Sequence, residues 1–253
     1  MGAGPARSAE LRIGGFPGRR DDVPARIGVL DLGTNTLSMT ALFGDVREPR
    51  RLRVAEELQF VTGLGKERAP DGSLSPDGMR RAWSALRHAS NRLAALGVPK
   101  RGIRGAATAA CREAPNGPEF LEHVRTALGL PFQVIAGAEE ARLVALSQAR
   151  SFPDRLPLVA VDIGGGSTEL VWPGGRESTE LGVVRLTERH VDIDPPGPST
   201  VARLTEVIDT RLARLGLPND ASALVGSSAS CSLMARLDMG LKTHEPERIH
   251  GYA

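Results

Sequence analysis

Two carboxylates flank a run of three glycines in the middle of the chain. The apolar segment Leu158–Ile163 is typical of a buried strand that contains Asp162 near its end, and Glu169 follows the glycines. Between these acids lie possible anion donors, namely Gly164, Gly165, Gly166, Ser167 and Thr168. Glycines allow a ligand to approach the backbone, and successive free N–H groups form an anion nest. Acids beside an anion repel it unless a cation lies between them, so the pattern indicates a phosphate with a divalent metal.

The first part of the chain contains a second copy of this arrangement. Ile27–Leu30 is an apolar strand, and it is followed by Asp31 and a polar turn of Thr34, Asn35 and Thr36. These three residues would supply donors from the opposite wall of a site, although an Asx-type turn would also explain them. Asp31 either joins a metal shell through water or shapes the turn. A simple glycine turn in a hairpin would account for neither the third glycine nor the repetition, so we expect a duplicated domain with a ligand between the copies.

The periodicity around these turns predicts a repeated order of elements. Strands are expected at residues 27–31, 36–43, 51–60, 103–107, 132–136 and 223–226, and from residues 158, 168 and about 176. Helices are expected from residue 75 to residue 97, at residues 109–114, 118–128, 138–150, 200–215 and 228–237, and near residue 183. The first copy is therefore βββαβαβα, and the second is βββαβα followed by a polar loop at residues 242–253.

This order predicts three segments. Residues 1–26 are rich in Gly, Pro, Ala and Arg and are expected to be a disordered tail. The first α/β domain is assigned to residues 27–145 and the second to residues 146–253. Compared with the first copy, the second lacks a final strand and helix, so we expect a chain that is short at its C-terminus.

Composition narrows the classes of partner. A hydrophobic fraction of 41% and a charged fraction of 25% are ordinary for a globular protein. Aromatic residues make up only 4%, which disfavours base-stacking platforms and hence a nucleic-acid partner. No apolar run approaches the roughly 18 residues of a membrane span, so no membrane partner is expected. The two cysteines, Cys111 and Cys231, are typical of reduced thiols, which favours a cytoplasmic protein.

The two turns resemble the phosphate loops of the exopolyphosphatase/guanosine-pentaphosphate phosphohydrolase family. The matching stretches are Asp31–Thr36 and Asp162–Glu169, and three more agree in order: Ala107–Ala114, Val134–Arg142 and Leu181–Glu188. A single turn motif would be weak, whereas five in sequence are specific, and they span about residues 27–251. The resemblance implies an actin-like ATPase (ribonuclease H-like) fold, in which two βββαβαβα domains surround a cleft. Ala109, Cys111 and Ser227–Ser230 depart from the family pattern.

The resemblance also implies roles for individual side chains. Glu140 is the expected general base, Arg112 a phosphate clamp, and Asp162 and Glu169 the carboxylates that bind Mg²⁺ and orient water, with Asp31 as a further metal candidate. Each has a plainer explanation. Glutamates are favoured in the first turn of a helix by about 0.3–1 kcal/mol, Arg112 would be an ordinary surface residue, and Glu169 a solvated strand end.

The resulting hypothesis is a Mg²⁺-dependent hydrolase that removes terminal orthophosphate from inorganic polyphosphate. Guanosine pentaphosphate is the alternative substrate for the same chemistry. A non-catalytic phosphate or alarmone sensor is an alternative of another class, and a kinase of the same superfold is a third. The kinase is disfavoured because Glu140 and Glu169 suit the activation of water. A homodimer is left open.

Overall fold

The computed structural model describes residues 25–48, 51–155, 157–218 and 223–253. The first half of the molecule is a five-stranded sheet in the order β3-β2-β1-β4-β5. Its strands are β1 (Ala25–Leu32), β2 (Thr36–Gly44), β3 (Arg53–Val61), β4 (Ile103–Ala107) and β5 (Phe132–Val134). β1, β4 and β5 are parallel, and β2 runs antiparallel to both of its neighbours.

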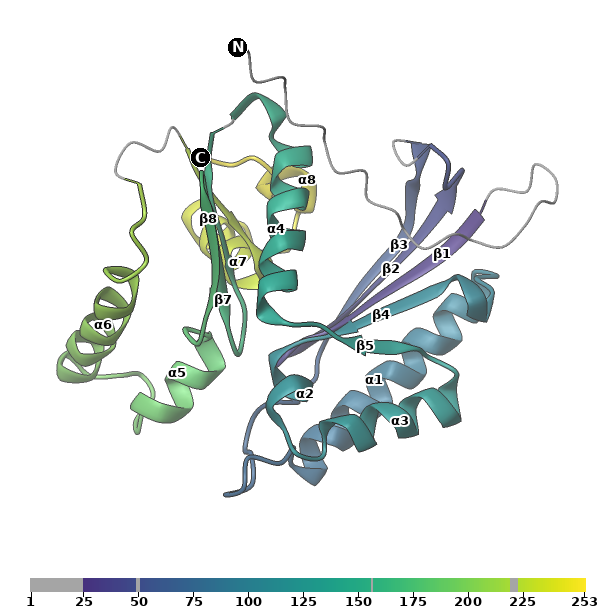
Figure 1. Ribbon diagram of the computed structural model, residues 1–253, viewed down its shortest axis with the longest axis horizontal. Helices are drawn as coiled ribbons and strands as arrows, with labels where there is room; N and C mark the ends of the chain where they lie inside the picture. Colours follow the sequence, from purple (N-terminus) through teal and green to yellow (C-terminus); the bar gives the residue numbers. More distant parts are fainter. Residues whose placement is uncertain (1–24, 49–50, 156, 219–222) are drawn as a thin grey trace, which may run out of the picture.

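Two helices, α1 (Pro76–Ala95) and α3 (Gly117–Leu128), cover one face of this sheet (Figure 1). α1 begins at Pro76 because the Ser75 hydroxyl caps it, accepting the Gly78 N–H at 3.1 Å. The apolar residues on one side of α1, including Leu86 and Leu93, are fully buried in the core that also contains Leu30 of β1. This large core fixes the end of β1, where Asp31 lies.

The second half repeats the pattern with four described strands, in the order β8-β7-β6-β9. They are β6 (Val159–Ile163), β7 (Thr168–Trp172), β8 (Gly175–Thr179) and β9 (Leu224–Ser227). β6 pairs antiparallel with β7 and parallel with β9, as β1 does with β2 and β4. The expected duplication is therefore confirmed.

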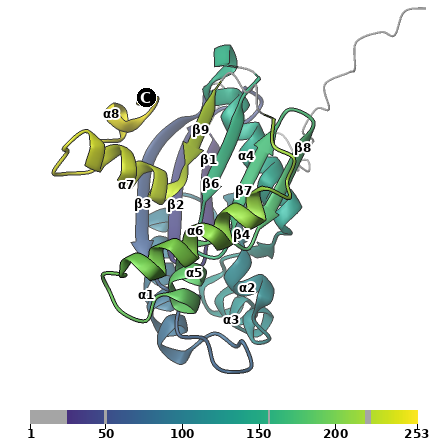
Figure 2. The ribbon, with the colours of Figure 1, turned by 90° about the vertical axis from the view of Figure 1, so that its left-hand side faces the viewer.

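The remaining helices are α2 (Ala109–Glu113), α4 (Gly137–Ser151), α5 (Val183–His190), α6 (Pro198–Leu212), α7 (Ser228–Asp238) and α8 (Pro246–Ile249). α4 follows the last strand of the first sheet but packs on the second, where its Val144 contacts the small core of Leu158, Ala160 and Val225 (Figure 1). The predicted domain boundary after residue 145 falls within this helix. Figure 2 shows α5 at the same end of the molecule as α1 and α2 of the first half.

The structure corrects a few expected elements. β5 ends at Val134 rather than at residue 136, and the C-terminal stretch expected to be a loop contains the short helix α8. The predicted tail lies outside the described residues except for Ala25 and Arg26, which begin β1. Both cysteines are free thiols. Among the described helices, none is long and apolar enough to cross a membrane.

Candidate active site

The loop between β6 and β7, Gly164–Ser167, is held by the N-terminus of α5. The Gly164 oxygen accepts the Val183 N–H at 3.0 Å, and the Gly165 oxygen accepts the Val184 N–H at 2.9 Å. The Gly166 oxygen accepts Nε of Arg185 at 2.8 Å. In a planar trans peptide the N–H points away from the carbonyl, so the next three N–H groups turn away from α5. Within the described part of the chain, the N–H groups of Gly165, Gly166 and Ser167 have no acceptor. These three unpaired N–H groups are the donors of the expected anion nest, called the nest below.

The loop between β1 and β2, Gly33–Thr36, is built in the same way. The Thr34 oxygen accepts the Gly65 N–H at 2.9 Å, and the Asn35 oxygen accepts the N–H groups of Thr62 and Gly63 at 2.8 and 3.0 Å. These bonds fix the carbonyls on the side of residues 62–65. The loop then packs directly on the glycines: a Cβ added to Gly165 would lie 3.1 Å from Thr34 Cβ and 3.2 Å from Asn35 Cβ. The predicted residues Thr34 and Asn35 are therefore brought together with the second loop, and Thr36 begins β2 beside them.

Asp162 and Glu169 are register partners on β6 and β7, so their side chains lie on the same face of the second sheet. Glu169 is almost fully buried and accepts a hydrogen bond from Ser178 Oγ at 2.7 Å. Burial raises the pKa of Glu169, and the hydroxyls of Ser178 and Ser167 offset part of that rise. Burial also raises the pKa of Asp162, against a hydrogen bond from the Ser227 side chain. Burial therefore disfavours the charged form of both carboxyls.

Asp31 occupies the corresponding position on β1 in the first half. Its side chain is reached by solvent, but protein surrounds it closely enough to disfavour the charged form. This desolvation, together with the charge of Asp162, raises the pKa of Asp31 to about 6. The charge of one aspartate of the duplicated motif therefore disfavours ionisation of the other, which lies in the opposite half.

Glu140 lies in the first turn of α4 with 18% of its side chain exposed. Burial, with the nearby charge of Glu169, raises its pKa to about 8, while Arg112 acts in the opposite direction. Arg112 extends from α2 in the first half, and its Nη1 lies 3.3 Å from Glu140 Oε2 and 2.9 Å from the Ile135 oxygen. The neighbouring Glu139 instead pairs with Arg142 at 2.7 Å and is 42% exposed. The structure thus separates the two glutamates: only Glu140 faces the other carboxylates.

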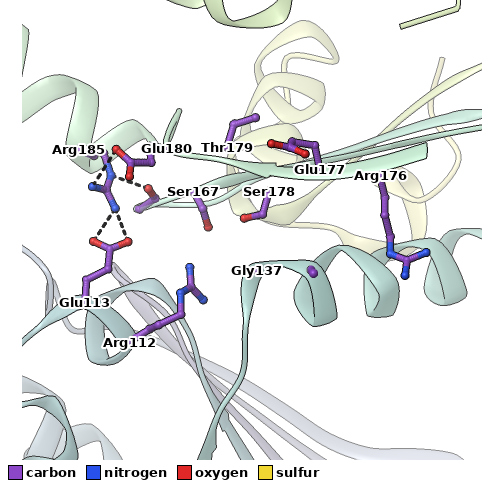
Figure 3. Close-up of a pocket in the computed structure, with 12 residues that line it drawn as sticks. Arg112, Glu113, Gly137, Ser167, Arg176, Glu177, Ser178, Thr179, Glu180 and Arg185 are labelled. Carbon is purple, nitrogen blue, oxygen red and sulfur yellow. Dashed lines mark hydrogen bonds and ion pairs between the residues drawn. The ribbon is translucent and has the colours of Figure 1, made fainter. Parts of the chain in front are cut away.

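A cavity of about 470 Å³ adjoins this group between the two halves (Figure 3). It is lined from the first half by Arg112 and Glu113 and from the second by residues of the glycine loop, α4, α5 and β8. The lining residues of the second half are Gly137, Ala138, Gly166, Ser167, Arg176, Glu177, Ser178, Thr179, Glu180 and Arg185. Three arginines, Arg112, Arg176 and Arg185, give the described lining positive charge beside the glycine loop.

The carboxylates near the two loops do not by themselves complete a metal site. Over the described ranges, no group of three or more His, Cys, Asp or Glu side chains is arranged to hold a metal ion. The expected set of Asp31, Asp162 and Glu169 is thus not arranged as a three-carboxylate site among the described residues, and Glu169 accepts a hydrogen bond from Ser178 on β8. Mg²⁺ is commonly bound by only one or two carboxylates together with substrate phosphates. Asp31 and Asp162, hard oxygen donors with raised pKa values, fit that form of site.

Several residues at the site were not assigned a role from the sequence. Ser178 fixes Glu169, Arg185 holds the glycine loop, and Glu113 pairs with Arg185. Ser228 adopts a φ of 89° and donates to the Ile163 oxygen at 2.8 Å, which ties the end of β6 to the start of α7. Signals for three of them were present in the sequence. Glu113 and Arg185 lie in the matching stretches Ala107–Ala114 and Leu181–Glu188, and Ser228 belongs to the run of hydroxyl residues directly after β9.

Comparisons with known proteins agree with this geometry. The model of the Ppx/GppA phosphatase family matches residues 46–252. A solved Ppx/GppA family member from Aquifex aeolicus is 28% identical, with a TM-score of 0.71, over 90% of this chain and 74% of that chain. A solved exopolyphosphatase-like protein is 29% identical, with a TM-score of 0.77, over 87% of this chain and 71% of that chain.

A solved exopolyphosphatase from Cytophaga hutchinsonii shares the fold at 24% identity and a TM-score of 0.71, over 88% of this chain and 73% of that chain. The duplicated sheets, the paired loops and the extent of the family match lead to one assignment. The chain belongs to the Ppx/GppA phosphatase family, a family of exopolyphosphatase-like phosphoanhydride hydrolases with the actin-like ATPase fold.

Proposed function

We propose that this protein is an exopolyphosphatase that releases terminal orthophosphate from inorganic polyphosphate. The observation that carries the proposal is Glu140, a carboxyl with a pKa raised to about 8 that lies beside Arg112 and is affected by the charge of Glu169. A general base is most effective when its pKa is near the working pH. A carboxyl that served only to stabilise a helix N-terminus would have no reason to face Glu169 and Asp31.

The proposed reaction places the terminal phosphoryl group against the N–H groups of Gly165, Gly166 and Ser167. Glu140 removes a proton from water as the water oxygen attacks the phosphorus. The bridging P–O bond breaks, its electron pair stays on the shortened polyphosphate, and orthophosphate leaves. Arg112 supports the charge on the phosphoryl oxygens. Mg²⁺, held by Asp31 and Asp162, would neutralise part of the phosphate charge when bound.

The lining of the cavity favours polyphosphate over guanosine pentaphosphate. Arg176 offers a cation for further phosphates, whereas the described lining contains no aromatic side chain on which a guanine could stack. Guanosine pentaphosphate remains the second candidate, since the reacting group would be the same. The proposed setting is the cytoplasm, which suits the unpaired Cys111 and Cys231.

The test is phosphate release from polyphosphate and from guanosine pentaphosphate, each with Mg²⁺ and with a chelator. We expect Glu140→Gln to lower the rate by roughly 10²–10⁴ because it removes the base. Glu139→Gln is the matched control: it neutralises the adjacent glutamate in the same helical turn, and we expect a rate within about threefold of wild type.

Three outcomes would contradict the proposal. Release that survives Glu140→Gln would remove Glu140 as the base. Binding of polyphosphate by the wild type without release would favour the sensor. Transfer of phosphate from ATP to an acceptor would favour the kinase.

A further inference from the structure

The two halves are joined by an ion pair beside the glycine loop. Glu113 ends α2 in the first half, and Arg185 lies in α5 of the second (Figure 3). Nη2 of Arg185 lies 2.6 and 2.7 Å from the two carboxylate oxygens of Glu113. Only 14% of the Arg185 side chain and 30% of the Glu113 side chain are exposed. A charge-assisted contact at this burial is stronger than a surface pair.

The same guanidinium also binds the nest. While Nη2 contacts Glu113, Nε of Arg185 donates to the Gly166 oxygen at 2.8 Å. The Gly166 carbonyl and the Ser167 N–H belong to one planar peptide, so fixing the carbonyl fixes the direction of that N–H. Arg185 therefore connects a carboxylate of the first half to the orientation of a nest donor in the second.

We propose that Glu113 and Arg185 are a positioning pair that aligns the anion nest with the first half of the molecule. Neither side chain is required to touch the reacting phosphoryl group. Their pairing orients the Gly166–Ser167 peptide only when α2 and α5 are in register, so the nest is complete only when the halves are together. The expected change in KM rests on the proposed function. The expected change in the order of the glycine loop does not.

Arg68 provides the matched control for this pair. It also faces Glu113, with Nη1 3.5 Å from Oε2, but it comes from the same half as Glu113 and donates to the Ala110 oxygen at 3.3 Å. It makes no contact with the glycine loop in the described structure. Arg68→Gln removes a cation from Glu113 without breaking the connection between the halves, whereas Arg185→Gln breaks that connection.

The kinetic test compares Glu113→Gln, Arg185→Gln, the double variant and Arg68→Gln. We expect Glu113→Gln and Arg185→Gln each to raise KM for polyphosphate about tenfold, because each loses one charge-assisted hydrogen bond. Their kcat should stay within about threefold of wild type. A misaligned nest lowers the fraction of competent enzyme and so weakens binding. The double variant should be no worse than Arg185→Gln alone, and Arg68→Gln should stay within about twofold of wild type. Additive effects, or an equal effect of Arg68→Gln, would overturn the proposal.

A second measurement does not depend on activity. Hydrogen exchange of the segment 158–170 should be faster in Glu113→Gln than in wild type, although Glu113 lies in the other half, and unchanged in Arg68→Gln. Unaltered exchange in Glu113→Gln would refute the pair as a positioning device. If the wild type released no phosphate, the proposed function would fail while this exchange comparison still tested the pair.

Discussion

At the scale of single residues, the site depends on one unusual carboxyl. Glu140 and Glu139 are adjacent and chemically identical, yet Glu139 is paired with Arg142 while Glu140 has a pKa near 8. The difference in pKa arises mainly because Glu140 is buried, and the negative charges of Glu169 and Asp31 disfavour its ionisation further. A carboxyl in this environment can accept a proton near neutral pH, whereas an ordinary surface glutamate cannot.

This environment predicts the pH dependence of the reaction. A base must be deprotonated, so kcat/KM should rise with pH and reach half its maximum near pH 8, falling about tenfold per unit below that. Below pH 6 the fall should steepen, because Asp31 also becomes protonated there. The measurement is a pH profile of kcat/KM for phosphate release.

Arg112→Gln is the control for this profile. Arg112 lowers the pKa of Glu140, so its removal should displace the profile to higher pH. If the profile instead reflected titration of the substrate, it would be the same in Arg112→Gln and in wild type. A profile that is flat between pH 6.5 and 8 in wild type would show that Glu140 is not the titrating base.

At the scale of elements, α5 carries much of the precision of the nest. Its first N–H groups hold the carbonyls of the glycine loop, and its N-cap, Gly182, packs against that loop. A Cβ at Gly182 would lie 2.5 Å from the carbonyl carbon of Gly165, which is closer than real Cβ contacts. The nearest atoms all belong to the backbone of Gly165 and Gly166, so no flexible side chain can move aside.

Gly182→Ala should therefore push α5 away from the loop. We expect a loss of about 1–3 kcal/mol in the free energy of unfolding, together with a raised KM. Gly197→Ala is the matched control, because Gly197 is also a helix N-cap in an extended conformation but has open space around it. Denaturant unfolding and steady-state kinetics of both variants measure the difference. Equal losses in the two variants would mean that the cost comes from capping and not from the packing of α5 on the loop.

The sequence predicted most of the elements because their signals are local. Ser75-Pro76 marked the start of α1, and the repeated Asp-x-Gly turns marked both loops and the duplication. The pairing of Glu113 with Arg185 could not be predicted, because it joins residues 72 positions apart and depends on how the halves are placed. For the same reason the sequence could not show that Glu169 accepts a hydrogen bond from Ser178, since this contact depends on the pairing of β7 with β8.

At the scale of the whole molecule, the described carboxylates and the nest have opposite effects on the binding of an anion. Asp31, Asp162, Glu140 and Glu169 repel an anion, while the N–H groups between the halves attract one. Binding of phosphate should therefore require a cation at the same time. This coupling can be measured without catalysis, in the Glu140→Gln variant, with tripolyphosphate as the ligand.

We expect Mg²⁺ and tripolyphosphate together to raise Tm by about 5–10 °C at a hundredfold excess over Kd, and either one alone to raise it much less. Thermal unfolding of Glu140→Gln with each ligand, with both, and with tripolyphosphate plus chelator measures the shifts. An equal shift with chelator present would show that the phosphate site works without a metal, and that Asp31 and Asp162 have another role.

The path of α4 has a consequence for recombination between relatives. This helix follows the first sheet in the chain but packs on the second, and it carries Glu140 toward Arg112 of the first half. A chimaera that joins the halves of two homologous proteins therefore has to cross over before Gly137 and not after Ser151, so that α4 stays with the sheet that supports it. Such a chimaera must also inherit compatible partners at Arg112–Glu140 and Glu113–Arg185, since each pair takes one residue from either parent.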